Sequence, residues 1–269
     1  MIDRDSIHVW RVRLDAMAAL PVNERAARLE SWRAMLSAEE RRRAGAFASI
    51  EHGEVYIVAH AVLRFVLGVY LGVSPSLIEI GPSDGTKPTL AAASRGANHR
   101  EFTAKEWLDL RFNLSHTRGA VLIGIAAGRE LGVDVEWQRP MEDLEGMARS
   151  VMSDRELSQW NALELESRMR AFYHVWTRKE SYLKAIGLGL FRSLQDVTVP
   201  VSADAMEDSA RDSRVVLDRS GEGTWSVLDV AAGASYSASV CWEGTEAPSL
   251  VVRDLDITRC DLTVVGGLK

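Results

Sequence analysis

Apolar and polar positions change their spacing along the chain, and each spacing predicts a type of element. Residues 7–14 alternate between apolar and polar side chains, which is typical of a half-buried strand. Elsewhere apolar residues recur at intervals of three and four, the pattern of a helix with one buried face. The helices expected from this pattern cover residues 23–35, 37–47, 53–71, 142–163 with a break near Ser153, and 170–190 with Gly187 and Gly189 as the stop.

Short apolar runs bounded by turn residues predict the strands. Residues 120–127 and 131–136 are joined by Gly128-Arg129-Glu130, so we expect them to form a β-hairpin. Two polar segments without a clear period, 91–107 and 202–213, are expected to be exposed loops. The other expected strands cover residues 77–80, 215–217, 224–230, 236–242 and 250–252, the last four in one antiparallel sheet. Helix-then-strand order recurs in both halves, which indicates an α+β fold with two similar units.

Composition places the chain among ordinary globular proteins. Its 269 residues are 46% apolar and 26% charged, and 32 basic against 38 acidic residues leave a formal net charge of −6. Nothing in this balance suggests nucleic-acid binding, so an anionic ligand would need a local basic cluster. Cys241 and Cys260 have no CxxC or CxxH spacing, and zinc or redox motifs are therefore not supported. Because the N-terminal segment is charged and the apolar stretches look too short or interrupted to span a bilayer, we expect a cytoplasmic monomer without a membrane partner.

Two acidic residues lie on one face of an expected strand. Asp134 and Glu136 are two positions apart, and Val133 and Val135 occupy the opposite, apolar face. Simple exposure to solvent is one interpretation of such a pair. The other is a cation site, because neighbouring carboxylates repel each other and their oxygens are the ligands that Mg²⁺ prefers.

The helix over residues 170–190 offers a third carboxylate. Trp176, Glu180 and Lys184 are spaced by four residues and line up along one side of the helix. A glutamate four residues before a lysine is also an ordinary stabilising pair, worth about 0.2–0.5 kcal/mol. If the helix crosses the acidic face of the strand, however, Glu180 would join Asp134 and Glu136.

A site of this kind that handles phosphate also needs cations and hydrogen-bond donors. Arg41, Arg42 and Arg43 form a basic run that could equally be a solvated helix face. The other candidate donors are Lys87 before a proline, Ser115 and His116 before a strand, and Lys179 and Lys184 on the long helix.

Three ordered motifs resemble a known family. The sequence is similar to 4′-phosphopantetheinyl transferases of the surfactin-synthetase-activating (Sfp) type. The motifs that carry the resemblance are Phe112-Asn113-Leu114-Ser115-His116, Gly132-Val133-Asp134-Val135-Glu136 and Trp176-Thr177-Arg178-Lys179-Glu180-Ser181-Tyr182-Leu183-Lys184, with weaker matches around residues 36–47, 63–64 and 86–88.

The resemblance implies a fold and a reaction. The fold would consist of two pseudo-symmetric α+β subdomains, residues 1–119 and 120–269, with coenzyme A in the cleft between them and the metal site on the second. The enzyme would transfer the 4′-phosphopantetheine arm of coenzyme A to a serine hydroxyl of an apo acyl or peptidyl carrier protein. Adenosine 3′,5′-bisphosphate would be released.

The resemblance also implies roles for the candidate residues. Asp134, Glu136 and Glu180 would hold Mg²⁺, for which Mn²⁺ could substitute. Glu180, Lys184 and Asp134 would be catalytic, with Glu180 either activating the carrier serine or acting only as a metal ligand. The residues that would bind coenzyme A are Arg43, Lys87, Ser115, His116, Lys179 and Lys184.

Two other functions are compatible with the same residues. A non-catalytic module that binds coenzyme A or a carrier protein could share the fold, although it would have no need of three acids and Lys184. An unrelated Mg²⁺-dependent phosphotransferase is less consistent with the chain, which has neither a P-loop nor a kinase-like glycine loop.

Overall fold

The computed structural model describes residues 2–81, 87–91, 109–187, 193–202, 215–219 and 223–263. Gly189 and nearly all of the two expected loops, 91–107 and 202–213, lie outside these ranges. The helices are α1 (Asp15–Ala18), α2 (Val22–Met35), α3 (Ala38–Ala46), α4 (Ile50–Leu71), α6 (Leu144–Val151), α7 (Asp154–Asn161) and α8 (Leu165–Ile186), with short 3-10 turns at Pro75–Leu77 and Leu194–Asp196. The strands are β1 (Ser6–Arg13), β2 (Ile80–Gly81), β3 (Thr89–Leu90), β4 (Leu110–Thr117), β5 (Ala120–Ala127), β6 (Leu131–Trp137), β7 (Val215–Arg219), β8 (Gly223–Asp229), β9 (Tyr236–Glu243) and β10 (Ser249–Asp254).

The strands form two four-stranded sheets and a short β2–β3 pair. The first sheet has the order β10-β1-β5-β4 and the second β6-β9-β8-β7. The expected hairpin of residues 120–127 with 131–136 is wrong, because β5 pairs with β4 and β1 whereas β6 pairs with β9. The actual hairpin is β4–β5, and the expected subdomain boundary at residue 120 falls at the start of its second strand. Strand β10 is not in the second sheet either, since it pairs in parallel with β1.

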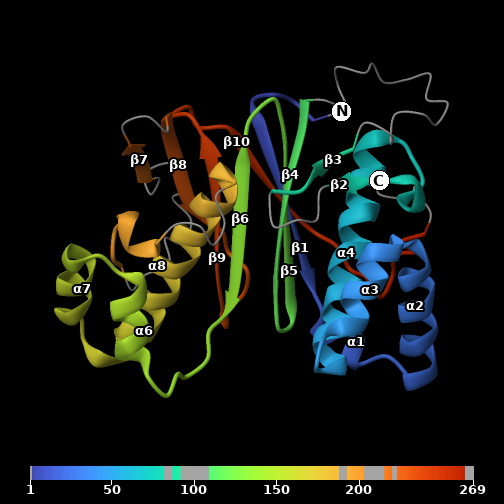
Figure 1. Cartoon of the computed structure of the whole chain (residues 1–269), viewed down its shortest axis with the longest axis horizontal. Helices are drawn as coiled ribbons and strands as arrows, with labels where there is room; N and C mark the ends of the chain where they lie inside the picture. Colours follow the sequence, from blue (N-terminus) through green and yellow to red (C-terminus); the bar gives the residue numbers. More distant parts are fainter. Residues whose placement is uncertain are drawn as a thin grey trace.

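The two sheets and their two long helices form four layers (Figure 1). Helix α4 covers one face of the first sheet, and α8 covers one face of the second. Alternate residues of β1 and β6 point away from these helices, and they pack in a shared core between the sheets that includes Ile7, Val9, Val133 and Val135. The α+β class is confirmed, and each half repeats the unit of one sheet and one long helix.

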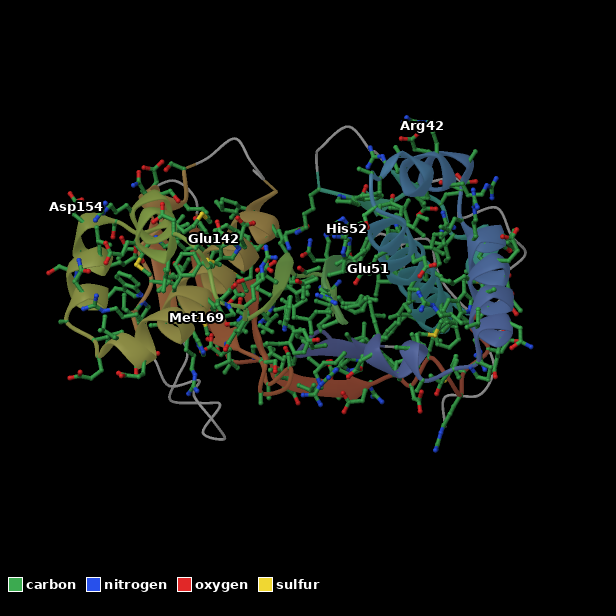
Figure 2. All side chains as sticks on the ribbon, turned by 90° about the horizontal axis from the view of Figure 1, so that it is seen from below. Arg42, Glu51, His52, Glu142, Asp154 and Met169 are labelled. Atoms are coloured by element: carbon green, nitrogen blue, oxygen red, sulfur yellow. The ribbon has the colours of Figure 1, made fainter. Side chains whose placement is uncertain are left out.

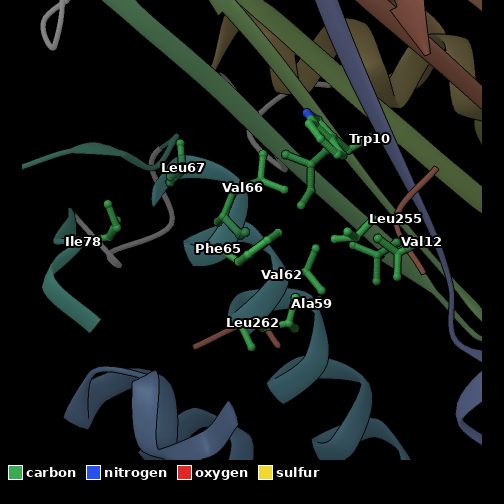
Figure 3. Packing of buried hydrophobic residues seen from close by; sticks show 14 of the residues in the cluster. Trp10, Val12, Ala59, Val62, Phe65, Val66, Leu67, Ile78, Leu255 and Leu262 are labelled. Carbon is green, nitrogen blue, oxygen red and sulfur yellow. The ribbon is translucent and has the colours of Figure 1, made fainter. Parts of the chain in front are cut away.

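Helix α4 is the centre of the first half. Val62, Phe65 and Val66 pack against Trp10 and the neighbouring strands (Figure 3). Contrary to the expectation for the longest apolar stretches, α4 is long and apolar enough to cross a membrane by length and composition alone, with a mean hydropathy of 1.6. Since 67% of that window is buried inside the protein, its surroundings are those of a core helix.

A buried ion pair anchors α3 to α4. Ser37 and Glu40 form the expected capping box at the start of α3. The same Glu40 carboxylate accepts hydrogen bonds from the buried Arg64 guanidinium, the closest at 2.7 Å. Burial alone would raise the pKa of Glu40, but its hydrogen bonds with His60 and Arg64 lower it to about 2. The stabilisation that the ionised Glu40 gives the folded state is fully present above pH ~4.5 and is lost as the pH falls from there towards 2.

We expect Glu40→Ala to lower the free energy of unfolding by about 3–5 kcal/mol, because Arg64 would be left as an uncompensated buried charge. Chemical denaturation at pH 7 measures this loss. Glu39→Ala is the matched control. Glu39 pairs with Arg42 and Arg43 of the same helix at the surface, where ion pairs contribute little, so this variant should change the free energy of unfolding far less than Glu40→Ala does. Equal losses in the two variants would contradict the anchoring role of Glu40.

The two halves meet where β4, an edge of the first sheet, lies beside β6, an edge of the second. Polar side chains at alternate positions of β4 accept hydrogen bonds from alternate backbone N–H groups of β6. Asn113 Oδ1 accepts from Val133, at 2.9 Å, and Ser115 Oγ accepts from Val135, at 3.3 Å. Thr117 Oγ1 continues the series with Trp137. This seam fixes the first half against the strand that carries Asp134 and Glu136.

Candidate active site

The acidic face of β6 lies against α8. Asp134 and Glu136 point away from the core between the sheets, as their alternation with Val133 and Val135 predicts. Gly132, the preceding residue on this face, allows the close approach of the helix. A Cβ atom at this position would lie 2.1 Å from the carbonyl oxygen of Ser181 in α8. The missing side chain therefore brings α8 against β6.

Asp134 is the buried centre of the site. Only 3% of its surface is exposed, and its Oδ1 atom accepts hydrogen bonds from Lys184 Nζ at 2.6 Å and from Ser115 Oγ at 2.9 Å. Lys184 Nζ also lies 2.9 Å from Ser115 Oγ. Asp134 Oδ2 is buried without a hydrogen-bond partner among the described residues. A buried carboxylate oxygen is costly to leave unpaired, so this atom marks a position suited to a cation or a donor.

Glu136 and Glu180 complete a set of three coupled carboxylates. Burial, followed by the charge of Asp134, raises the pKa of Glu136 to about 7. Burial and the same aspartate also raise the pKa of Glu180. Lys184 opposes both shifts, but one cation does not neutralise three carboxylates. Among the described residues, no three His, Cys, Asp or Glu side chains are arranged closely enough to hold a metal ion. In this structure the three carboxylates therefore form an acid cluster with Lys184 as its counter-ion.

His116, on β4, lies in the first half next to residues of α4. Its ring is open to solvent within the cleft, but the surrounding protein and the nearby charges of His60 and Lys184 lower its pKa. His60 stacks on Tyr56, with ring centroids 4.0 Å apart, and Tyr56 in turn interacts with Arg43. Arg43 itself pairs with Glu39 at 2.9 Å and is partly exposed. Arg43 is therefore linked to His116 through Tyr56 and His60, although it does not line the cavity that His116 lines.

Lys179 is not available to bind coenzyme A, and its assignment to that site is corrected. Its ammonium group has no exposed surface and pairs with the equally buried Glu156, at 2.5 Å. It also donates to the carbonyl oxygens of Val151 and Leu194, at 2.8 and 3.0 Å. These three bonds use all the donors of a lysine. Lys179 thus holds α8 to α6, α7 and the following turn.

Lys87 also has protein partners. Its Nζ atom donates to Glu130 at 2.5 Å and to the carbonyl oxygen of Ala185 at 2.9 Å. Arg111 pairs with the other oxygen of Glu130. Lys87 therefore lies at the C-terminal end of α8, where it is bonded to Glu130 and to the helix backbone. A contact between Lys87 and coenzyme A stays a prediction.

A cavity of about 550 Å³ opens between the two halves beside the acids. His116 and Glu136 are the predicted residues in its wall. Glu51 and His52 line it from the side of α4 that faces the other half (Figure 2). The remaining lining residues are mainly large and apolar, and come from both halves: Phe47, Val55, Thr117, Arg118, Trp137, Arg139, Met141, Met147, Tyr173 and Trp176. The cavity agrees in position with the cleft expected to hold the ligand.

Some residues that shape the site were not identified from the sequence. The seam residues Asn113 and Thr117 each use a short polar side chain on a strand whose opposite face is apolar, and Thr117 also donates to Glu136 at 3.3 Å. The alternation of Asn, Ser and Thr with Phe and Leu along β4 is the sequence pattern that could have identified this strand and its polar face. Gly132 gave a second signal, since a glycine inside a strand often marks close approach of another backbone.

Sequence comparisons with known proteins bear on the family of the chain rather than on this geometry. A family model described as the 4′-phosphopantetheinyl transferase superfamily matches residues 130–241, which include Asp134, Glu136, Glu180 and Lys184. The chain is 30% identical over 198 residues to the 4′-phosphopantetheinyl transferase HetI of Nostoc sp., covering 74% of this chain and 75% of the relative. It is 26% identical over 171 residues to a 4′-phosphopantetheinyl transferase of Bacillus subtilis, covering 64% and 69% of the two chains. Identity to the Bacillus subtilis transferase Sfp is 25% over 175 residues, covering 65% and 70%.

These matches support the superfamily more strongly than the Sfp type in particular. The acids and the lysine singled out on β6 and α8 lie together inside the matched region. The chain is an enzyme that belongs to the 4′-phosphopantetheinyl transferase superfamily.

Proposed function

We propose that this enzyme transfers the phosphopantetheine arm of coenzyme A to a serine hydroxyl of an apo carrier protein in an Mg²⁺-dependent reaction. The serine oxygen forms a new bond to the β-phosphorus of coenzyme A. The bond between that phosphorus and the bridging oxygen breaks, and adenosine 3′,5′-bisphosphate leaves with the electron pair. The observation that carries the proposal is the buried Asp134, held by Lys184 and Ser115 and close to the carboxylates of Glu180 and of Glu136, which lines the cavity.

The donor set fits a hard divalent cation. Asp134 Oδ2 lacks a hydrogen-bond partner among the described residues, and the pKa values of Glu136 and Glu180 are raised by burial and by carboxylate repulsion. A bound cation would give Asp134 Oδ2 a partner and would offset the repulsion among the carboxylates. Oxygen donors of this kind select Mg²⁺ or Mn²⁺. Asp134, Glu136 and Glu180 would hold the ion. When bound, it would neutralise charge on the diphosphate.

The protein's own cation and hydrogen-bond donors have separate roles. Lys184 is held in place by Asp134 and Ser115, and its ammonium group would stabilise negative charge on the leaving phosphate. Ser115 orients both groups. Glu180, whose pKa is raised, is suited to accept the proton of the carrier serine. His116, which lines the cavity, and Arg43, at the end of α3, would bind the phosphates of the nucleotide.

Mass spectrometry of a panel of apo carrier proteins tests the proposal. After incubation with this enzyme, coenzyme A and Mg²⁺, at least one carrier should gain the mass of one phosphopantetheine group. The same carrier with its acceptor serine replaced by alanine should gain nothing. Absence of the mass shift from fatty-acid, polyketide and nonribosomal-peptide carriers alike would reject the proposed reaction.

Arg43→Ala is expected to weaken the binding of coenzyme A about ten-fold, because the variant loses a charge-assisted contact with the 3′-phosphate. Dephospho-coenzyme A, which lacks that phosphate, should bind the variant and the unaltered enzyme equally. Isothermal titration calorimetry with both ligands makes the comparison. An equal loss for the two ligands would show that Arg43 does not meet the 3′-phosphate.

A further inference from the structure

Four buried hydroxyl groups join α8 to the second sheet. Thr177 and Ser181, one helical turn apart on α8, meet Ser237 and Ser239 of β9. Ser239 Oγ lies 2.9 Å from Ser181 Oγ and 2.7 Å from the carbonyl oxygen of Thr177. Thr177 Oγ1 lies 3.2 Å from Ser237 Oγ. Within α8, Thr177 Oγ1 also donates to the carbonyl oxygen of Tyr173 at 3.0 Å, and Ser181 Oγ donates to that of Arg178 at 2.9 Å. All four residues are at most 3% exposed. We call this set the hydroxyl ladder.

The ladder lies directly beside the acid cluster. On the paired strand, Asp134 is the cross-strand neighbour of Ser239, and Glu136 is the neighbour of Ser237. On the helix, Lys184 follows Ser181 by three residues and Glu180 follows Thr177 by three. One stripe of α8 therefore crosses the serines of β9, and the adjacent stripe crosses the acids of β6.

Hydroxyl groups define the register of a helix on a sheet more strictly than apolar contacts do. An apolar side chain that slides by a fraction of a turn finds other apolar neighbours. If α8 slides, Thr177 and Ser181 keep their bonds to carbonyl oxygens within the helix, but the buried hydroxyls of Ser237 and Ser239 lose their partners on α8 and incur the cost of unsatisfied polar groups. Two residues of a strand and one turn of a helix span similar lengths, so both rungs of the ladder can be satisfied in one register only.

We propose that the hydroxyl ladder is the device that positions Glu180 and Lys184 over the acids of β6. Thr177, Ser181, Ser237 and Ser239 are positioning residues: they touch neither substrate nor metal, and they act through the register of α8. The proposal rests on the proposed function, because it explains how that site is assembled. It also gives a role to Thr177 and Ser181, which lie within the sequence motif of residues 176–184.

Variants of Thr177 separate register from packing. Thr177→Val keeps the size of the side chain but removes the hydroxyl, whereas Thr177→Ser keeps the hydroxyl but removes a methyl group. We expect Thr177→Val and Ser239→Ala to lower kcat ten- to a hundred-fold, since displacements of about 1 Å can cost 10²-fold. Thr177→Ser should stay within two-fold of the unaltered enzyme. A role in packing alone predicts the opposite order for the two Thr177 variants.

Ser226→Ala is the matched control. Ser226 is also fully buried in the second sheet, but its hydroxyl donates to the carbonyl oxygen of Gly244, at 2.8 Å, and not to α8. The Ser226→Ala enzyme should lose about as much thermal stability as the Ser239→Ala enzyme, but its kcat should be unchanged. All variants are assayed well below their melting temperatures, so that loss of folded protein does not contribute to the rates.

Two readouts do not depend on turnover. Mn²⁺ binding, measured by electron paramagnetic resonance, should weaken about ten-fold in Thr177→Val and Ser239→Ala and remain unchanged in Ser226→Ala. Hydrogen exchange of the α8 amides should accelerate in the first two variants only. If kcat, Mn²⁺ affinity and α8 exchange in the ladder variants all match those of Ser226→Ala, the positioning role is rejected. If the unaltered enzyme modifies no carrier, the proposed function fails, whereas hydrogen exchange still decides whether the ladder holds α8.

Discussion

Replacing Glu180 by glutamine should lower the rate of carrier modification about a thousand-fold, the order expected when a positioned charge is removed from a transition state. Glutamine keeps the size and the hydrogen-bonding carbonyl of the side chain, but it carries no charge and cannot accept the serine proton. It would also be a weaker ligand for Mg²⁺. Turnover of an apo carrier at saturating coenzyme A and Mg²⁺ measures the effect.

The same variant should be no less stable than the unaltered enzyme when metal is absent. Burial and the charge of Asp134 raise the pKa of Glu180, so ionisation of Glu180 is less favourable in the metal-free fold than in an exposed side chain. Removing that charge relieves repulsion, and a gain in stability with a loss of activity is typical of functional residues. Glu166→Gln, at an exposed position in the first turn of α8, should leave both quantities unchanged. A Glu180→Gln enzyme with undiminished turnover would remove Glu180 from the mechanism.

The sequence predicted the acid cluster because the relevant periodicities are local. Asp134 and Glu136 share a face of β6 through the two-residue repeat of a strand, and Glu180 and Lys184 share a side of α8 through the helical repeat. That the two faces meet came from the resemblance to a family. The contact of Lys184 with both Asp134 and Ser115 then required the fold, since it joins three elements.

The misassignment of Lys179 to the coenzyme A site has a physical reason. From the sequence, a lysine next to Glu180 is as good a phosphate ligand as one four residues later. Lys179 points to the opposite side of α8, where Glu156 of α7 neutralises it in the core. No local pattern marks Glu156 as buried, because in the sequence it reads as the acid of the capping box that begins with Ser153. The acid does both.

Strand pairing was the part of the fold that local patterns did not determine. Two apolar runs separated by Gly128-Arg129-Glu130 resemble a hairpin, but β6 leaves the first sheet and pairs with β9, about a hundred residues later. The tight turn lies instead at Arg118 and Gly119, where Gly119 has a φ of 82° and joins β4 to β5. Strand β4 itself was missed because its polar side chains, which form the seam with β6, resemble those of a loop.

Gly132→Ala is expected to impair catalysis about a hundred-fold without altering any group that touches substrate. The new Cβ atom would lie 2.1 Å from the carbonyl oxygen of Ser181 and 2.4 Å from the backbone nitrogen of Ala185. Because these are backbone atoms of α8, no side-chain rotation relieves the clash, and the helix must move away from β6. Lys184 and Glu180 would move with it. Overpacking of this kind should also cost about 1–3 kcal/mol of stability.

Gly45→Ala distinguishes this effect from a general intolerance of alanine in place of glycine. Gly45 lies within α3, and a Cβ atom there would have no other atom within 4 Å. Alanine is the better helix former, so this variant should gain up to about 1 kcal/mol and keep its kcat. Steady-state kinetics and thermal unfolding of the two variants make the comparison. If Gly132→Ala keeps its kcat while losing stability, the separation of α8 from β6 does not control the rate, and the acids must tolerate a displaced helix.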